Sequence, residues 1–306
     1  NFHGPPSDLV VVYVLDTSDT IPSLSAASRT SIATLARTLD DASDLPLWMG
    51  AVSTEMEADL RNCEDPLGGA LMREVDPRIP GCIPSAEPPV PTLVTDGDSN
   101  GFVCLTTTGE PCGVESPWES LASAITPSSS GLRFGIRGLP GEGDWLQAFE
   151  DPHVAVIALL PEDDCSTHIP DFHSSPLRSG EGDERCALHA ADLLPVERFV
   201  DAVRAVRPAH RVSFHVHAGI RPEDAGRSLT ELATDPALAP RFRPGGTQLE
   251  PLCRDPLGGV AVYQADRHLD LLVALEAAGI RSEIGSLCGE VETDANRFAE
   301  TILGSE

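Results

Sequence analysis

Residues 8–16 read DLVVVYVLD, in which seven apolar residues stand between two aspartates. A run rich in β-branched residues without polar alternation predicts a strand that is buried on both faces, as strands of parallel sheets are. The segment HVAVIALL, residues 153–160, has the same character. Further strands are predicted by shorter apolar runs at residues 47–54, 102–105, 212–218 and 281–288.

Helical spacing of apolar residues separates these strands. It predicts helices at residues 23–39, 195–206, 266–278 and 292–303, and another that starts at Ser116. There Ser116 is expected to cap the helix, Pro117 to occupy its first turn and Glu119 to close a capping box. Gly279 is expected to end the helix before it.

Strands that alternate with helices predict an α/β fold, namely a doubly wound, mostly parallel, Rossmann-like sheet flanked by helices. We expect a single domain over residues 1–306, with long disulfide-bonded insertions at about 57–113, 165–190 and 219–262.

The chain is strongly acidic, with 48 carboxylates, 21 basic residues and a formal net charge of -27. Every basic residue among the 21 is arginine. This balance argues against nucleic acid and anionic membranes as partners, because no basic patch is available to displace their counterions. It favours cations or basic partners, although a solvated acidic surface is the simpler interpretation.

The eight cysteines are even in number and include no CxxC pair, which disfavours zinc-ribbon and thioredoxin-like sites. We expect up to four disulfides in an oxidising compartment, hence a secreted, periplasmic or cell-surface protein. Spacing leaves the pairing open among Cys63, Cys82, Cys104, Cys112, Cys165, Cys186, Cys253 and Cys288.

No run of eighteen apolar residues occurs, so no transmembrane segment is predicted. The sequence starts at Asn1 rather than at a methionine, which is consistent with a removed signal sequence and leaves room for an N-terminal lipid anchor.

The first candidate site follows the first strand. Asp16, Ser18 and Thr20 place oxygen atoms at alternate positions, where ligands of open α/β sheets gather. Such hard oxygens suit Mg²⁺ or Ca²⁺. Alternatively, Asp16 and Ser18 cap the helix that follows.

Seven segments carry a further pattern, namely VVYVLDTSDT, MGAVSTEM, PCGVESPWESLASAI, VAVIALLPEDDCS, LPVERFVDAVRAV, LEPLCRD and IGSLCGEVE. Together they resemble the von Willebrand factor A-type (VWA) domains. The likeness is closer to a group of secreted or lipid-anchored bacterial proteins, typical of myxobacteria, whose VWA domains carry extra cysteines. It covers roughly residues 8–304 and implies a Rossmann-like sheet flanked by helices and a role in adhesion or complex formation.

The resemblance also implies a metal-dependent adhesion site that begins with an Asp-x-Ser-x-Ser loop. Asp16 and Ser18 match that loop, and Thr20 replaces its second serine. The family places another aspartate after the fourth strand, where this chain has Pro161, so Glu162, Asp163 or Asp164 would substitute. The family's metal-binding threonine has no clear counterpart; Glu115 is nearest in place, and residues 106–108 lie further back. The predicted ligands are Asp16, Ser18, Thr20, Glu115, Asp163 and Asp164.

A second candidate is the sequence from Asp96 to Gly101, where Asp98 and Asn100 complete the opening of a calcium loop. The twelfth position is Thr107 rather than glutamate, so an exposed acidic turn is the preferred alternative.

A third candidate is the pair His215 and His217, which project from one face of a strand and could share Zn²⁺. An acid, His153, His168 or His173 would complete the site. Ordinary hydrogen-bonded histidines are preferred, since this spacing arises easily by chance.

No nucleophile elbow, phosphate-binding glycine loop or HExxH helix occurs. We therefore predict a non-enzymatic extracellular adhesion or protein-binding domain that uses Mg²⁺ or Ca²⁺ and no organic cofactor. Its partner is expected to be a protein, the chain itself included. The alternatives are a metal-free structural or self-assembly module of a surface filament and a secreted zinc-dependent hydrolase.

Overall fold

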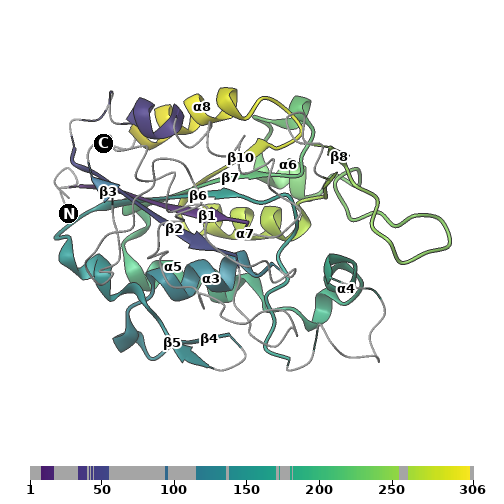
Figure 1. Ribbon diagram of the computed structural model, residues 1–306, viewed down its shortest axis with the longest axis horizontal. Helices are drawn as coiled ribbons and strands as arrows, with labels where there is room; N and C mark the ends of the chain where they lie inside the picture. Colours follow the sequence, from purple (N-terminus) through teal and green to yellow (C-terminus); the bar gives the residue numbers. More distant parts are fainter. Residues whose placement is uncertain are drawn as a thin grey trace, which may run out of the picture.

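The computed structural model describes most of the sheet and of its helices (Figure 1). It covers residues 8–16, 34–39, 41, 43, 45–54, 94–95, 115–135, 138–169, 172, 180, 182–254 and 261–303. Several predicted features lie outside these residues, namely Ser18, Thr20, the loop from Asp96 to Gly101, His173, the strand at 102–105, and Cys63, Cys82, Cys104 and Cys112.

In the part of the chain that the structure describes, six strands form the central sheet, in the order β10-β7-β6-β1-β2-β3. Four successive pairs are parallel, and only the pair of β2 with β3 is antiparallel. The predicted doubly wound, mostly parallel sheet is therefore confirmed. The strands are β1 (Leu9–Leu15), β2 (Leu47–Ser53), β3 (Val94–Thr95), β6 (His153–Leu159), β7 (Val212–Ala218) and β10 (Arg281–Ser286).

The order of the strands reverses between β1 and β6. From β1 the chain moves outward to β2 and β3, and it then returns to β6 on the other side of β1. In open α/β sheets the crevice at the carboxyl ends of two such strands is the usual place for a ligand. Asp16 directly follows β1, and Glu162 lies three residues beyond β6.

Side chains of β1 alternate between two cores, one on each face of the sheet. Val10, Val12 and Val14 belong to the core beneath α3, α5 and α7. Leu9, Val11, Tyr13 and Leu15 belong to the other core, which helical residues 34–39 and α8 cover. Figure 1 shows the sheet between these two helical layers. The helices are α3 (Pro117–Ile125), α4 (Gly182–Leu188), α5 (Val196–Val206), α6 (Leu229–Ala233), α7 (Asp266–Ala277) and α8 (Val291–Leu303).

Within the described residues, two short hairpins and five 3₁₀ turns lie outside this framework. The hairpins pair β4 (Arg133–Phe134) with β5 (Leu139–Pro140), and β8 (Cys253–Arg254) with β9 (Ala261–Val262). The 3₁₀ turns are Ser128–Ser130, Gly143–Ala148, Ala190–Asp192, Ala209–Arg211 and Pro222–Asp224.

The start of α3 differs from the expected capping box. In this fully described helix, the Ser116 side chain makes no capping hydrogen bond. Glu119 instead turns to another part of the chain, where it accepts a hydrogen bond from the Gly135 amide at 2.8 Å and pairs with Arg198 at 3.0 Å. A long-range ion pair thus replaces the local cap, and α3 is joined to α5 and to the β4–β5 hairpin.

The end of α7 is as predicted, because Gly279 follows the helix with a positive φ of 81°. A left-handed backbone of this kind is favourable for glycine and strained for other residues.

Two disulfides join described cysteines, Cys165 with Cys186 and Cys253 with Cys288. No cysteine within the described residues is free. The first bond links the segment that follows β6 to helix α4. The second links the β8–β9 hairpin to the segment that follows β10. No described helix is long and apolar enough to cross a membrane.

Candidate functional site

Three carboxylates meet at the point where the strand order reverses. One ligand oxygen from each of Asp16, Glu115 and Glu162 lies within 4.8 Å of the other two. Glu115 is almost fully buried, with 1% of its surface exposed, while Asp16 and Glu162 are half-buried. Among the described residues this is the only group of three or more acidic, histidine or cysteine ligands with such spacing.

Each carboxylate is positioned by a different element of the sheet edge. Asp16 is the first residue after the buried strand β1. Glu162 comes after β6, from which Leu160 and Pro161 separate it. Backbone hydrogen bonds of 2.8 Å hold the segment of Glu115 on both sides: Ser116 N–H donates to the Thr54 carbonyl beyond β2, and Cys165 N–H donates to the Glu115 carbonyl. The fold therefore brings together residues that are far apart in the sequence.

The donor set fits a hard divalent cation. Three negative charges within a few ångströms repel one another strongly at the edge of a protein interior, where screening by water is weak. A dication would offset this repulsion, and carboxylate oxygens are the ligands that Mg²⁺ and Ca²⁺ prefer. Zinc favours sulfur and nitrogen ligands, and this group contains neither.

Glu162, rather than Asp163 or Asp164, lies in this cluster. The Asp163 carboxylate accepts hydrogen bonds from the Arg267 and His268 amides, at 3.0 and 3.3 Å, and so caps α7. Asp164 is fully buried, pairs with Arg267 at 2.9 Å and accepts a hydrogen bond from the Ser166 hydroxyl. Both aspartates therefore hold the start of α7 in place. The sequence alone did not indicate that Asp163 caps this helix.

His215 and His217 project together from β7 into the core beneath α8, as the spacing predicted. The ring of Phe298 lies against both imidazoles, with centroid distances of 4.9 and 4.6 Å. Glu283 lies 3.9 Å from His215, and Asp294 lies 4.0 Å from His217. In the described part of the chain, no set of three metal ligands includes either histidine.

Burial governs the protonation of these histidines. It lowers the pKa of His215, although the nearby Glu283 opposes the shift. Burial, with the charge of Arg297 adding to it, lowers the pKa of His217 to about 3. Burial likewise lowers the pKa of His153 to about 4, and the His153 ring is hydrogen-bonded to the Ser213 hydroxyl at 3.1 Å. All three histidines therefore lie where burial disfavours their charged forms.

No family model matches the chain, and no curated protein matches its sequence. Solved structures resemble it at low identity. The PilB minor pilin from Streptococcus sanguinis is 10% identical with a TM-score of 0.43, over 99% of this chain and 62% of that one. A von Willebrand factor type A structure from Catenulispora acidiphila is 11% identical with a TM-score of 0.37, over 98% and 43%. An aerotolerance-related membrane protein from Bacteroides fragilis is 11% identical with a TM-score of 0.36, over 97% and 100%.

The chain thus spans less than two thirds of the pilin and of the Catenulispora structure. At these identities and TM-scores, the three structures carry no argument about the function of this chain.

Proposed function

We propose that this chain is a VWA-type binding domain that acts outside the cytoplasm and has no catalytic role of its own. A divalent cation, Mg²⁺ or Ca²⁺, is held by Asp16, Glu115 and Glu162, and a carboxylate of a protein partner completes its coordination. The convergence of these three side chains at the reversal of the strand order is the observation that carries the proposal.

Three further observations support it. Asp16 begins the motif Asp-x-Ser-x-Thr, so Ser18 and Thr20 would add hydroxyl ligands. The two disulfides favour an oxidising compartment, since such bonds seldom persist in the cytosol. The sequence resemblance to cysteine-containing VWA proteins of myxobacteria fits a secreted or surface-anchored location.

The metal is tested by thermal unfolding with and without added Mg²⁺ or Ca²⁺. A cation that binds only the folded state stabilises it by about 2.7 kcal/mol at a hundredfold excess over its Kd, and so raises the Tm. We expect the Tm increase to disappear in Asp16→Ala, Glu115→Gln and Glu162→Gln. Glu197→Gln, which changes an exposed carboxylate on α5, is the matched control. A shift that survives all three substitutions would place the cation elsewhere.

The chemistry of the partner is tested by binding the metal-loaded protein to two immobilised peptides. The peptides are identical except that one carries an aspartate where the other carries an asparagine. Binding that requires both the aspartate and the divalent cation supports the proposed coordination. Binding that persists in excess chelator would show that the cation does not mediate it.

A further inference from the structure

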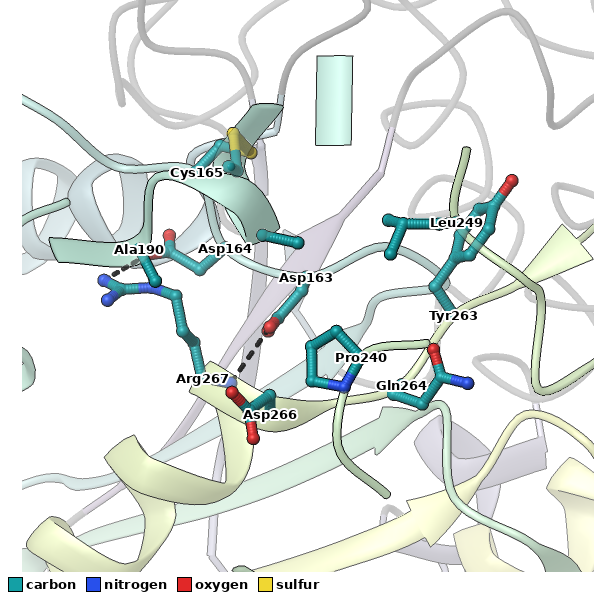
Figure 2. Close-up of a pocket in the computed structure, with 12 residues that line it drawn as sticks. Asp163, Asp164, Cys165, Ala190, Pro240, Leu249, Tyr263, Gln264, Asp266 and Arg267 are labelled. Carbon is teal, nitrogen blue, oxygen red and sulfur yellow. Dashed lines mark hydrogen bonds and ion pairs between the residues drawn. A yellow bond between two sulfur atoms is a disulfide. The ribbon is translucent and has the colours of Figure 1, made fainter. Parts of the chain in front are cut away.

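A small pocket whose lining includes none of the three clustered carboxylates lies between the start of α7, the disulfide of Cys165 and the chain that precedes β8 (Figure 2). Its volume is about 40 Å³, which exceeds the space that one water molecule needs. The residues that line it are Asp163, Asp164, Cys165, Cys186, Ala187, Ala190, Pro240, Leu249, Tyr263, Gln264, Asp266 and Arg267.

The Gln264 side chain offers this pocket a hydrogen-bond acceptor. Gln264 is 3% exposed, and its Nε2 donates to the Glu250 carbonyl at 3.3 Å. Its Oε1 is buried and accepts no hydrogen bond from any described residue. In Figure 2 this oxygen points toward the space bordered by Tyr263 and Leu249. A buried acceptor without a donor is unfavourable, so a ligand that donates a hydrogen bond here would remove that cost.

The pocket is also negatively charged. Asp163 and Asp266 both line it, and Asp266 is the first residue of α7. Arg267 also lines it, but its guanidinium is bound to Asp164 and to the Leu194 carbonyl. Burial raises the pKa of Asp266 to about 6, and repulsion from Asp163 and Asp270 adds to the shift. A cation in the pocket would relieve this repulsion.

The remaining walls are apolar. Pro240, Leu249, Ala187 and Ala190 supply aliphatic surface, and Tyr263 supplies an aromatic side chain. Such walls suit the hydrocarbon stem of a long basic side chain whose charged end makes the polar contacts. An aromatic ring adds attraction for a cation that lies over its face.

We propose that this pocket binds the ammonium group of a lysine side chain from a partner protein. An ammonium is a compact charge with three donors, which suits acceptors spread over Asp163, Gln264 and Asp266 better than the planar guanidinium fork does. Residues 1–306 contain no lysine, so these residues of a second copy cannot supply the group. The inference goes beyond the proposed function because it does not require the metal.

The test is a titration of the full chain with acetyl-Gly-Lys-Gly-amide near neutral pH and low salt, followed by NMR or calorimetry. The matched probes replace lysine by norleucine, which lacks the charge, or by arginine. We expect the lysine peptide to bind ~10-fold more tightly than either. Norleucine cannot form the charge-assisted hydrogen bonds, and the planar guanidinium of arginine fits acceptors that are spread apart less well than an ammonium does.

Variants locate the binding. Asp266→Asn and Gln264→Leu should each weaken the lysine peptide ~10-fold. Glu276→Gln removes an exposed carboxylate of α7 that does not line the pocket, so it should leave binding unchanged. Asp16→Ala should abolish the cation-induced Tm shift and leave lysine binding intact, which separates the two proposals.

Equal binding of the lysine and norleucine peptides would overturn the proposal, as would full affinity in Asp266→Asn. Arginine binding as tight as lysine binding would overturn the choice of ammonium and redirect the search to guanidinium groups, including those of this chain. Thermal unfolding of each variant shows whether a loss of binding reflects the pocket or a loss of folding.

Discussion

Two clusters of ionisable side chains lie at the same sheet and differ in how they are built. Asp16, Glu115 and Glu162 come from three separate segments and converge on a shared space. His215 and His217 come from one strand, and the ring of Phe298 packs against both. Side chains two residues apart on a strand share a face but do not by themselves converge. A coordination site needs contributions from separate elements, and only the carboxylate cluster has them within the described residues.

Burial shifts the pKa values of histidines and aspartates in opposite directions, on either side of the sheet. Burial lowers the pKa of His217, so the folded state disfavours its charged form. Burial raises the pKa of Asp266 in the pocket at the start of α7, so there too the charged form is disfavoured. The shifts have opposite consequences for stability, because acid charges the histidine and neutralises the aspartate.

The largest effect is expected from Phe298→Ala, which removes the fully buried ring that packs against both imidazoles. Large-to-small changes of this kind lower the free energy of unfolding by about 3–5 kcal/mol. Chemical denaturation measures the loss, and Leu188→Ala at an exposed site is the control. Tight zinc binding by this variant would show that the Phe298 ring is all that keeps His215 and His217 from forming a metal site.

The second effect comes from replacing Cys253 and Cys288 together by serine. This bond joins residues 35 apart, and its loss should cost about 2–4 kcal/mol of stability. Both cysteines pack against the core of Phe298. The carboxylate cluster is not part of that core. The double variant should therefore still show a rise in Tm when Mg²⁺ is added, even though its Tm without Mg²⁺ is lower. Disappearance of the shift would show that the two regions are coupled.

The third effect is a loss of stability in acid. The folded pKa values of His217 and His153 are about 3 and about 4, below the unfolded value of about 6.5. The unfolded state therefore binds more protons between these limits, and stability falls as the pH is lowered from about 6.5 toward 3. The slope is at most about 1.4 kcal/mol per pH unit for each histidine.

His217→Leu should flatten the acid dependence, as denaturation midpoints at a series of pH values would show. An unchanged slope would assign the acid sensitivity to other groups.

The smallest effect is expected from Asp266→Asn. The folded pKa of Asp266 is raised to about 6, so its contribution to stability is lost as the pH rises through that value. The substitution should thus stabilise the protein at neutral pH by about 1 kcal/mol or less, since the side chain is only half-buried and solvent screens its charge. Thermal unfolding checks the sign. A destabilised variant would mean that Asp266 supports α7 rather than a ligand.

The strands that build the sheet could be predicted because their apolar runs are long and bounded by polar residues. The runs at 8–16, 153–160 and 212–218 have this form. The partners of individual charges could not. Ser116 and Glu119 have the spacing of a capping box, yet Glu119 binds Arg198, 79 residues away. Local spacing predicts local contacts, whereas a buried carboxylate takes whichever donor the tertiary fold supplies.

The candidate site shows the same limit. The sequence placed Asp16 at the sheet edge, and the family resemblance suggested Glu115. The choice among Glu162, Asp163 and Asp164 depends on which residue caps α7. Gln264 and Asp266 were not singled out as site residues, because no short motif marks them. Their role in a pocket depends on packing between α7 and segments more than fifteen residues away, such as that of Leu249.

The bond between Cys253 and Cys288 encloses all of β9, α7 and β10 in one covalent loop. A protease that cuts once within this loop would therefore release no fragment, and the two pieces would separate only after reduction. For a protein exposed to extracellular proteases, the segment that carries Asp266 and the capping site of α7 would stay attached after such a cut.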